Sequence, residues 1–596
     1  MNHFKRLLAL FLVVLVAGGM SMAKQNKLPL GFSMEPALKG FDRPSAMAMT
    51  NDGRIYVGER YTGNVYLVRY GKLIPTPLFT LDVSSRTDEG LLDMAYAPAG
   101  PGTGYLFTFY TDDITRANRV VRYTVSGLTA TNPFTVIDLG SSPGGTRVGG
   151  GVVVGNDGKL YISVGDMETS ANAQNSSSIY GKVLRLNVNG TIPVDNPTPG
   201  SAVYAKGFRD GVGIARHPAT PTLYQVDRGP AGGYDELNAV SSSGNYGWNI
   251  GTGPLGSPYT DPIDYRTPLV NPSGMAAYTG TFFPDWSADG TDNDLDGTRD
   301  ERHEKYGDSV FYGLYGSNDI IRSALTGANL TSQDSALTFF DSDIEWDGTA
   351  DTLCPAAWTD FEESGDQVFY GLSEDVSSNK DGIYRMIYNR KGAREVSPPG
   401  SIFPLTLEKN GSSLDVYWEN LDRDAWIGTK LGATQPNKKY TIWEGTLPIS
   451  GGSYNHSVLM LTDGTAVNDG LLTQTVTGGS GSRYYLVSSQ SGNLEGTLGW
   501  NTAAQERTNP RPTMDYCNEI GWWTSEDGDA AKETRCDNID NDGDGRIDES
   551  CAGTGCAPDF KNDLGQPVKL LDQYGNYWTL HDFRDELVHM DISSFT

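Results

Sequence analysis

The 596-residue sequence is short of basic residues, and this shortage limits the partners that it can bind. It contains 46 Lys and Arg against 74 Asp and Glu, which gives a formal net charge of -28 at pH 7. Nucleic acids and anionic lipids would be repelled by such a chain, so the composition argues against both as partners. The acidic excess instead favours solubility and the binding of cations.

Long hydrophobic runs are absent beyond the first residues. Residues 1–23 contain Lys5 and Arg6, an apolar stretch over 7–17 and a small-x-small sequence at 21–23, which is the pattern of a signal peptide. No later apolar run approaches the roughly 18 residues that a membrane-spanning helix requires. We therefore expect an exported protein, secreted, periplasmic or at the cell surface, with no transmembrane segment.

Cysteines are also few. Cys517, Cys536, Cys551 and Cys556 lie close together, and Cys354 stands alone. In an exported chain a local cluster more often forms disulfides than a thiolate metal site, and this spacing fits no zinc pattern. The pairing stays open.

A helical period is absent between residues 50 and 390, where one strand-like phrase recurs instead. Each copy is a turn followed by an apolar-aromatic pair and a strand, and several are followed by a second strand-like segment. The six copies are DGRIYVGERY (52–61), GTGYLFTFY (102–110), DGKLYISVGD (157–166), TPTLYQVDRG (220–229), GDSVFYGLYG (307–316) and GDQVFYGLSE (365–374). Repeats of this size with paired strands are typical of a β-propeller. The sequence therefore predicts an all-β fold class, with six four-stranded blades over residues 30–395.

The repeat pattern of the propeller region does not continue after residue 400. Residues 402–508 contain strand-like segments with an apolar-aromatic pattern and resemble a fibronectin type III module, which predicts a separate β-sandwich. Residues 557–596 resemble the start of a redoxin or thioredoxin-like domain. The redox cysteines of that family would follow this point, so we assign no thiol chemistry to this incomplete fragment.

Two aspartate-rich loops have nearly the same spacing. One lies in an insert at 289–308, and the other lies in the Cys/Asp-rich segment 509–556. Carboxylates stand at loop positions 1, 3, 5 and 9 in both: Asp292, Asp294, Asp296 and Asp300, then Asp540, Asp542, Asp544 and Asp548. With a glycine at position 6, this is the first half of an EF-hand-like loop, and it predicts Ca²⁺ binding. The alternative is that both loops are merely solvated. The second loop also resembles the aspartate-rich metal-binding repeats of secreted proteins.

Several longer phrases of the propeller region carry a family resemblance. They occur in order between residues 36 and 395: DEGLLDMAYAPA (88–99), GDMETSANAQNSSSIYGKVLRLNVNGTIPVDNP (165–197), VYAKGFRDGVGIARHP (203–218), DRGPAGGYDELNAV (227–240), GNYGW (244–248) and PSGMAAYTG (272–280). Together they resemble the soluble quinoprotein glucose/sorbosone (aldose sugar) dehydrogenases. The resemblance implies a six-bladed propeller that holds pyrroloquinoline quinone (PQQ) and Ca²⁺ near its axis. It also implies an aldose substrate that gives a hydride from its anomeric carbon to the quinone.

The resemblance also implies site residues. The family histidine that removes the sugar hydroxyl proton falls on Arg147, and Asp166 matches the acid beside it. An arginine cannot serve as a base near neutral pH. Arg209 matches a cofactor-binding arginine, although Asp210 follows it where the family usually has asparagine. The carbonyls of Gly229 and Pro230 match the turn that holds the Ca²⁺.

Other cofactor-binding cations of the family are missing. A family lysine or arginine falls on Tyr315, and a pair of arginines falls near Ala357 and Thr359. Arg147 could replace one of these anion contacts, or it could pair with Asp166 and fill the position of the base; the sequence favours the pair.

Two functions stay open. The chain is either a PQQ-dependent aldose sugar dehydrogenase with an altered site, or a non-catalytic, calcium-stabilised propeller. In the second case it would bind a carbohydrate or a protein partner at the cell surface.

Overall fold

The computed structural model describes most of the propeller region and part of the chain after it. The described residues are 28, 32–86, 88–100, 102–280, 283, 305–315, 317–340, 357–364, 367–374, 381–388, 396–397, 401–421, 427–428, 439–446, 455–468, 470–477, 482–491, 494–495, 570–571 and 577–578. The expected signal peptide, both aspartate loops and all five cysteines lie outside them. Of the redoxin-like segment, only the strands β35 (Leu570–Leu571) and β36 (Tyr577–Trp578) are described.

The described residues are almost entirely β-structure. Their helical elements are two short 3₁₀ helices, η1 (Ser170–Ala173) and η3 (Ala328–Leu330). No helix in the described part of the chain is long and apolar enough to cross a membrane.

The first three sheets of the propeller region each follow the chain. Sheet 1 contains β2 (Pro44–Met49), β3 (Ile55–Glu59), β4 (Asn64–Arg69), β5 (Lys72–Leu73) and the short β6 (Phe79–Thr80). Sheet 2 contains β7 (Leu91–Gly100), β8 (Thr103–Thr111), β9 (Asn118–Ser126) and β10 (Thr129–Gly140). Sheet 3 contains β11 (Gly149–Val154), β12 (Lys159–Val164), β13 (Lys182–Asn187) and β14 (Val203–Lys206).

The next three sheets continue this order, and the last one also takes a strand from the start of the chain. Sheet 4 contains β15 (Gly211–Arg216), β16 (Leu223–Asp227), β17 (Asp235–Val240) and β18 (Asp264–Arg266). Sheet 5 contains β19 (Pro272–Tyr278), β20 (Ser309–Leu314), β21 (Ile320–Thr326) and β22 (Ser332–Phe340). Sheet 6 contains β23 (Trp358–Glu363), β24 (Phe369–Ser373), β25 (Gly382–Tyr388), β1 (Phe32–Lys39) and β28 (Ile427–Gly428).

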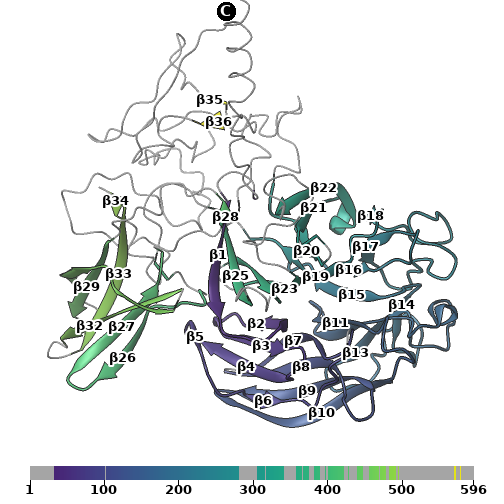
Figure 1. Ribbon diagram of the computed structural model, residues 1–596, viewed down its shortest axis with the longest axis horizontal. Coiled ribbons are helices and arrows are strands. Elements are labelled where there is room, and N and C mark those ends of the chain that lie inside the picture. The colour runs from purple at the N-terminus through teal and green to yellow at the C-terminus, as the bar shows by residue number, and fades with distance from the viewer. Residues whose placement is uncertain are drawn as a thin grey trace, which may run out of the picture.

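The first strands of the six sheets form a ring. Along the chain, β2, β7, β11, β15, β19 and β23 each contact the next, and β23 contacts β2 again. This is the arrangement of a β-propeller, and its sheets lie around a common centre in Figure 1. The N-terminal strand β1 pairs antiparallel with β25, so one sheet joins the two ends of the ring.

The six recurring phrases form the second strands of the six sheets, as the sequence predicts. These strands read as continuous apolar runs because the sheets stack against neighbours on both faces. In β3, β16, β20 and β24 every residue is buried. Burial on both faces removes the alternation that a half-exposed strand would show.

Two further sheets follow the propeller. One contains β26 (Thr406–Asn410), β27 (Ser413–Glu419), β32 (Leu471–Thr477) and β31 (Thr465–Asn468). The other contains β30 (Asn455–Thr462), β29 (Lys439–Thr446), β33 (Arg483–Ser491) and β34 (Leu494–Glu495). Trp418 and Val476 of the first pack in one core with Ile442 and Val487 of the second. The pair is therefore a β-sandwich (Figure 1).

The sandwich region is tied to the propeller by a buried charge cluster. Arg385 of β25 is 1% exposed and donates hydrogen bonds to Glu35 of β1, at 2.7 Å, and to Glu419 of β27.

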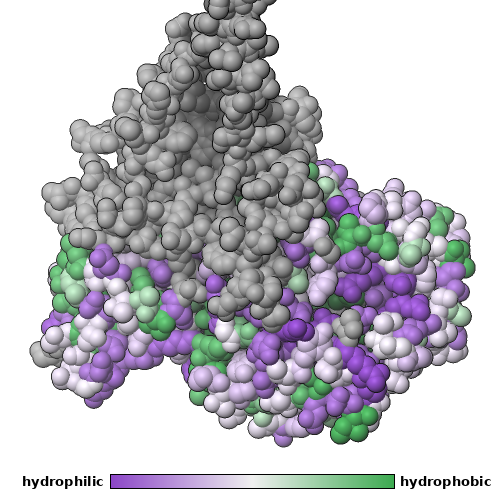
Figure 2. Space-filling model, viewed as in Figure 1, coloured by the Kyte–Doolittle hydropathy of each residue, from purple (hydrophilic) through white to green (hydrophobic). Residues whose placement is uncertain are grey.

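The face in Figure 2 mixes hydrophilic and hydrophobic residues and has no single large apolar patch over the described surface.

Candidate functional site

A cavity of about 270 Å³ lies where the six inner strands begin. Every sheet of the propeller contributes to its lining. The lining residues include Ser45, Arg60, Asp88, Leu92, Arg147, Gly149, Gly150, Asp210, Val212, Arg228, Asn271, Ser273, Tyr315 and Thr359. The lining combines charged side chains and hydroxyls with apolar groups such as Leu92, Val148 and Val212, so it can both hydrogen-bond and pack against a ligand.

The functional side chains come from two kinds of position. Asp88, Arg147, Asp210 and Asn271 stand just before inner strands, in the loops that lead into the ring. Arg60, Arg228 and Tyr315 stand just after second strands, where the recurring phrase ends. Both positions lie at the same end of the propeller because the first and second strands of each sheet are antiparallel.

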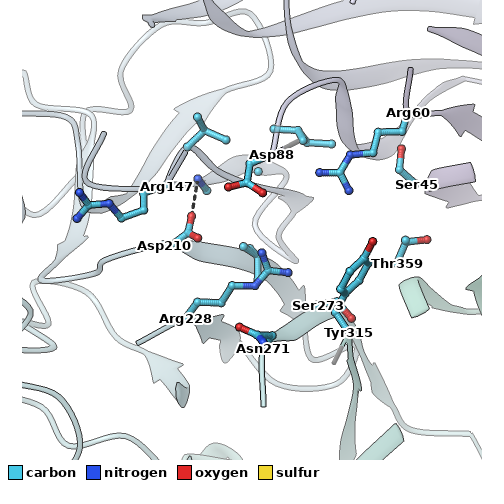
Figure 3. Close-up of a pocket in the computed structure, with 16 residues that line it drawn as sticks. Ser45, Arg60, Asp88, Arg147, Asp210, Arg228, Asn271, Ser273, Tyr315 and Thr359 are labelled. Carbon is cyan, nitrogen blue, oxygen red and sulfur yellow. Dashed lines mark hydrogen bonds between the residues drawn. The ribbon is translucent and has the colours of Figure 1, made fainter. Parts of the chain in front are cut away.

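Arg147 pairs with Asp166, as the sequence favours. Its Nη1 atom lies 3.0 Å from Oδ2 of Asp166, whose side chain is fully buried. Trp248 Nε1 donates to the same oxygen at 2.8 Å, while Oδ1 of Asp166 has no hydrogen-bond partner among the described residues. In Figure 3 the Arg147 guanidinium points away from the space that Asp88, Arg60 and Arg228 share.

The backbone around this pair is strained. Arg147, Met167 and Glu168 have φ values of 53°, 52° and 63°, in the left-handed region that side chains disfavour. Glu168 stabilises the loop before Arg147, because its Oε1 accepts hydrogen bonds from Gly144 N and from Thr146 N, both at 2.9 Å. These bonds lower the pKa of Glu168 against the opposing effect of burial.

Gly149 is required by a close approach of two backbone segments. It has a φ of 78°, and a Cβ atom there would lie 2.6 Å from the carbonyl oxygen of Ser163. The glycines after Arg147 therefore let strand β11 pack against β12, and Gly149 and Gly150 also line the cavity.

Asp210 lies in the lining with its carboxylate held in place. Its Oδ1 accepts a hydrogen bond from Gly149 N at 3.2 Å, and its own N–H donates to Asp227 Oδ1 at 2.6 Å. Burial raises the pKa of Asp210, while Arg228 and the Gly149 amide oppose that rise. Burial and nearby Glu236 hold the pKa of Asp227 well above its usual range.

Three arginines and a tyrosine share the cavity wall. Arg228 Nε donates to the carbonyl of Pro272 at 2.9 Å, and Arg60 Nη1 lies 3.8 Å from Oε2 of Glu374. Tyr315 is 45% exposed. Burial and the nearby Glu374 carboxylate raise its pKa, while Arg60 lowers it.

Arg209, Gly229 and Pro230 lie beside the cavity and are outside its lining. Arg209 Nη1 donates to the carbonyl of Arg228 at 2.9 Å, and its guanidinium lies 5.8 Å from the Trp248 ring centroid. Gly229 N donates to Asp235 at 2.7 Å, and the Pro230 carbonyl accepts from Gly233 N at 2.8 Å. Within the described residues, no group of three or more His, Cys, Asp or Glu side chains is arranged to hold a metal.

Tyr315 and Thr359, where the family resemblance places cations, do line the cavity and are neutral. Sequence reasoning assigned no role to Arg60, Asp88 or Asp210, which line it as well. The sequence did contain one clue to these positions, which is the place just after the strand of each recurring phrase. The residues that stand there include Arg60, Asp166, Arg228 and Tyr315.

The glucose/sorbosone dehydrogenase family model matches residues 41–296. An uncharacterized protein of Synechocystis sp. is 31% identical in an alignment 291 positions long, which covers 42% of this chain and 70% of the relative. The aldose sugar dehydrogenase YliI of Escherichia coli is 25% identical, over 52% of this chain and 85% of the relative. Quinoprotein glucose dehydrogenase B of Acinetobacter calcoaceticus is 29% identical, over 36% of this chain and 52% of the relative.

Solved structures of similar proteins were also found. The PQQ-bound aldose sugar dehydrogenase of Streptomyces coelicolor has 23% sequence identity and a TM-score of 0.48, and the match covers 60% of this chain and 99% of that one. The aldose sugar dehydrogenase of Escherichia coli in its apo form has 22% identity and a TM-score of 0.48, over 60% of this chain and all of that one.

Proposed function

Because the chain belongs to the glucose/sorbosone dehydrogenase family, we propose that its axial cavity binds an aldose and PQQ, and that the propeller is an exported aldose sugar dehydrogenase with an altered site. The observation that carries the proposal is the convergence of all six sheets on one cavity that contains both carboxylates and guanidinium groups. Its carboxylates can accept hydrogen bonds from sugar hydroxyls, and its guanidinium groups can donate them.

The donors around the cavity fit an anionic quinone. Arg60 and Arg228 come from two different sheets and face the same space, so they can neutralise carboxylates on one ligand. Arg228 and Arg60 would pair with the quinone, and the carbonyls of Gly229 and Pro230 would hold Ca²⁺. When bound, PQQ supplies the acceptor for the hydride of the sugar's anomeric carbon.

The same cavity should hold the quinone weakly. Arg147 is engaged by Asp166, Arg60 lies near Glu374, and Tyr315 and Thr359 carry no charge. A hydrogen bond to a charged group contributes roughly 1.5–3 kcal/mol, so the loss of two cations weakens binding by about 10²- to 10⁴-fold.

A second candidate function is a non-catalytic binding module at the cell surface, stabilised by Ca²⁺ at the aspartate loops. The Arg147–Asp166 ion pair favours it, because this pair fills the position of the family base with a group that does not accept a proton. The attached sandwich suits such a role.

The two functions are separated by titration of the purified protein with PQQ and Ca²⁺, followed by aldose-dependent dye reduction. Quinone binding with aldose-dependent reduction at saturating PQQ supports the dehydrogenase. Sugar binding without quinone binding or reduction supports the binding module. A protein that binds neither sugar nor quinone contradicts the dehydrogenase and also a carbohydrate-binding module, and leaves a protein partner as the ligand of the second function.

A further inference from the structure

The position that the family uses for its base is occupied in this chain by the Arg147–Asp166 ion pair. A guanidinium group does not act as a base near neutral pH, and Asp166 accepts hydrogen bonds from both Arg147 and Trp248 and lies outside the cavity lining. Neither residue is therefore suited to take a proton from a sugar in the cavity. A side chain that accepts the proton would therefore be another group of the lining.

Two carboxylates face the cavity instead, those of Asp88 and Asp210 (Figure 3). Asp210 is oriented by its surroundings, because its Oδ1 accepts from Gly149 N while its main chain bonds Asp227 and Arg228. Its second oxygen, Oδ2, has no hydrogen-bond donor among the described residues. Asp88 is half-buried, and no described residue donates a hydrogen bond to its carboxylate.

The charges around Asp210 suit a base. Burial raises its pKa and nearby Asp88 adds to that effect, whereas Arg228 and Arg209 lower it. Asp227 stands behind it and accepts its N–H. A general base works best when its pKa lies near the working pH, so a carboxyl group with a raised pKa is better suited than an ordinary one.

We propose that Asp210 accepts the proton of the sugar's anomeric hydroxyl, in place of the histidine that Arg147 replaces. The inference rests on the proposed dehydrogenase function. Asp210 Oδ2 takes the hydroxyl proton and becomes a neutral carboxyl group, and a bound quinone would supply the two-electron acceptor for the hydride of the C1–H bond. The sugar loses one proton and one hydride, and its C1–O bond becomes the carbonyl of a lactone.

Asp210 could have a purely structural role, in which its carboxylate only accepts the hydrogen bond from Gly149 N, or a catalytic role, in which it also takes a proton. Asp210→Asn separates the two roles, because the amide oxygen can still accept that bond but the side chain can no longer take a proton. Asp113→Asn is a charge-matched control, because Asp113 is exposed and lies outside the cavity lining.

The first test uses the full chain without quinone. Calorimetry compares glucose with 1-deoxynojirimycin, a glucose analogue whose ring nitrogen is protonated near neutral pH. A carboxylate near the anomeric carbon should favour the analogue by about 10-fold or more, and Asp210→Asn should remove most of that preference while Asp113→Asn keeps it. Binding of both ligands with a preference unchanged in Asp210→Asn overturns the inference and leaves the proposed function standing. If the protein binds neither ligand, the result contradicts both this inference and the proposed function.

The second test uses protein saturated with PQQ and Ca²⁺. Asp210→Asn should lower kcat by about 10²- to 10⁴-fold with KM nearly unchanged, and quinone affinity should be kept or improved. In the wild type kcat should rise with pH through one ionisation, which the variant lacks. The inference is overturned if the loaded wild type does not turn over, or if Asp88→Asn causes the loss and Asp210→Asn does not.

Discussion

The guanidinium of Arg147 and the carboxylate of Asp166 form an ion pair of 3.0 Å in which the aspartate is fully buried and the arginine is partly exposed. The pair joins the loop before β11 to the loop after β12, at a site where both backbones are strained. It therefore stabilises the rim of the cavity, and it also occupies the position where the family has its base.

Breaking this pair should destabilise the propeller. Asp166→Asn leaves Arg147 and Trp248 without a charged acceptor, and we expect a loss of about 1–3 kcal/mol in the free energy of unfolding. Denaturant titration of Asp166→Asn, Arg147→Met and the double variant measures the coupling between the two residues, expected to exceed about 1 kcal/mol. Additive single effects would show that the pair contributes nothing beyond its separate members.

A second cavity, of about 140 Å³, lies at the opposite ends of the inner strands and contains several acidic groups. Burial raises the pKa of Asp93 to about 7 and that of Glu362 to about 8. Asp360, Glu363 and Arg216 line the same cavity. Asp93 and Asp360 each accept backbone N–H groups of a neighbouring inner strand, from Val152 and Met47 respectively, so they also join neighbouring sheets.

These raised pKa values predict that the protein is more stable in mild acid. Between about pH 4 and pH 8 the folded state binds more protons at Glu362 and Asp93 than the unfolded state does, so the free energy of unfolding falls as the pH rises. Glu362→Gln, which costs no described hydrogen bond, should raise stability at pH 8 by on the order of 1 kcal/mol and have little effect at pH 4. Thermal melts from pH 4 to pH 9 check this. An equal gain at both pH values would point to packing rather than charge.

The aspartate loops are predicted to bind Ca²⁺, because each places four carboxylates around a glycine turn. Calorimetry on the full chain should show Ca²⁺ sites, one of which is lost in Asp294→Ala and another in Asp542→Ala. Each alanine should lower the melting temperature in the presence of Ca²⁺ but not in the presence of chelator. A melting temperature that responds to neither addition would mean that the loops are merely solvated.

The sequence predicted the elements of the propeller better than the site at its centre. The recurring phrases locate all six second strands because a strand buried on both faces leaves a local apolar signal. The closure of the ring by β1 depends on the pairing of residues 32–39 with 382–388, which no local pattern encodes.

The candidate site shows the same limit. The pairing of Arg147 with Asp166 could be predicted because the family resemblance places an acid, matched by Asp166, beside the position matched by Arg147. Arg60, Asp88 and Asp210 meet only because three sheets point their loops at one axis. Their convergence is set by the ring geometry and not by their spacing in the chain.

The last prediction concerns residue 147 itself. Arg147→His alone should not restore sugar oxidation at micromolar quinone, because the cation positions matched by Tyr315, Ala357 and Thr359 stay neutral and little quinone is bound. Tyr315→Lys should tighten quinone binding by about 10-fold or more, since it adds a charged partner at the cavity wall. The double variant should then gain more than the two single changes predict, because a base has no effect without bound cofactor. Aldose-dependent dye reduction across a quinone titration measures all four proteins. Robust wild-type turnover at micromolar quinone would contradict this prediction and would mean that the cavity holds the quinone tightly with the cations that it has.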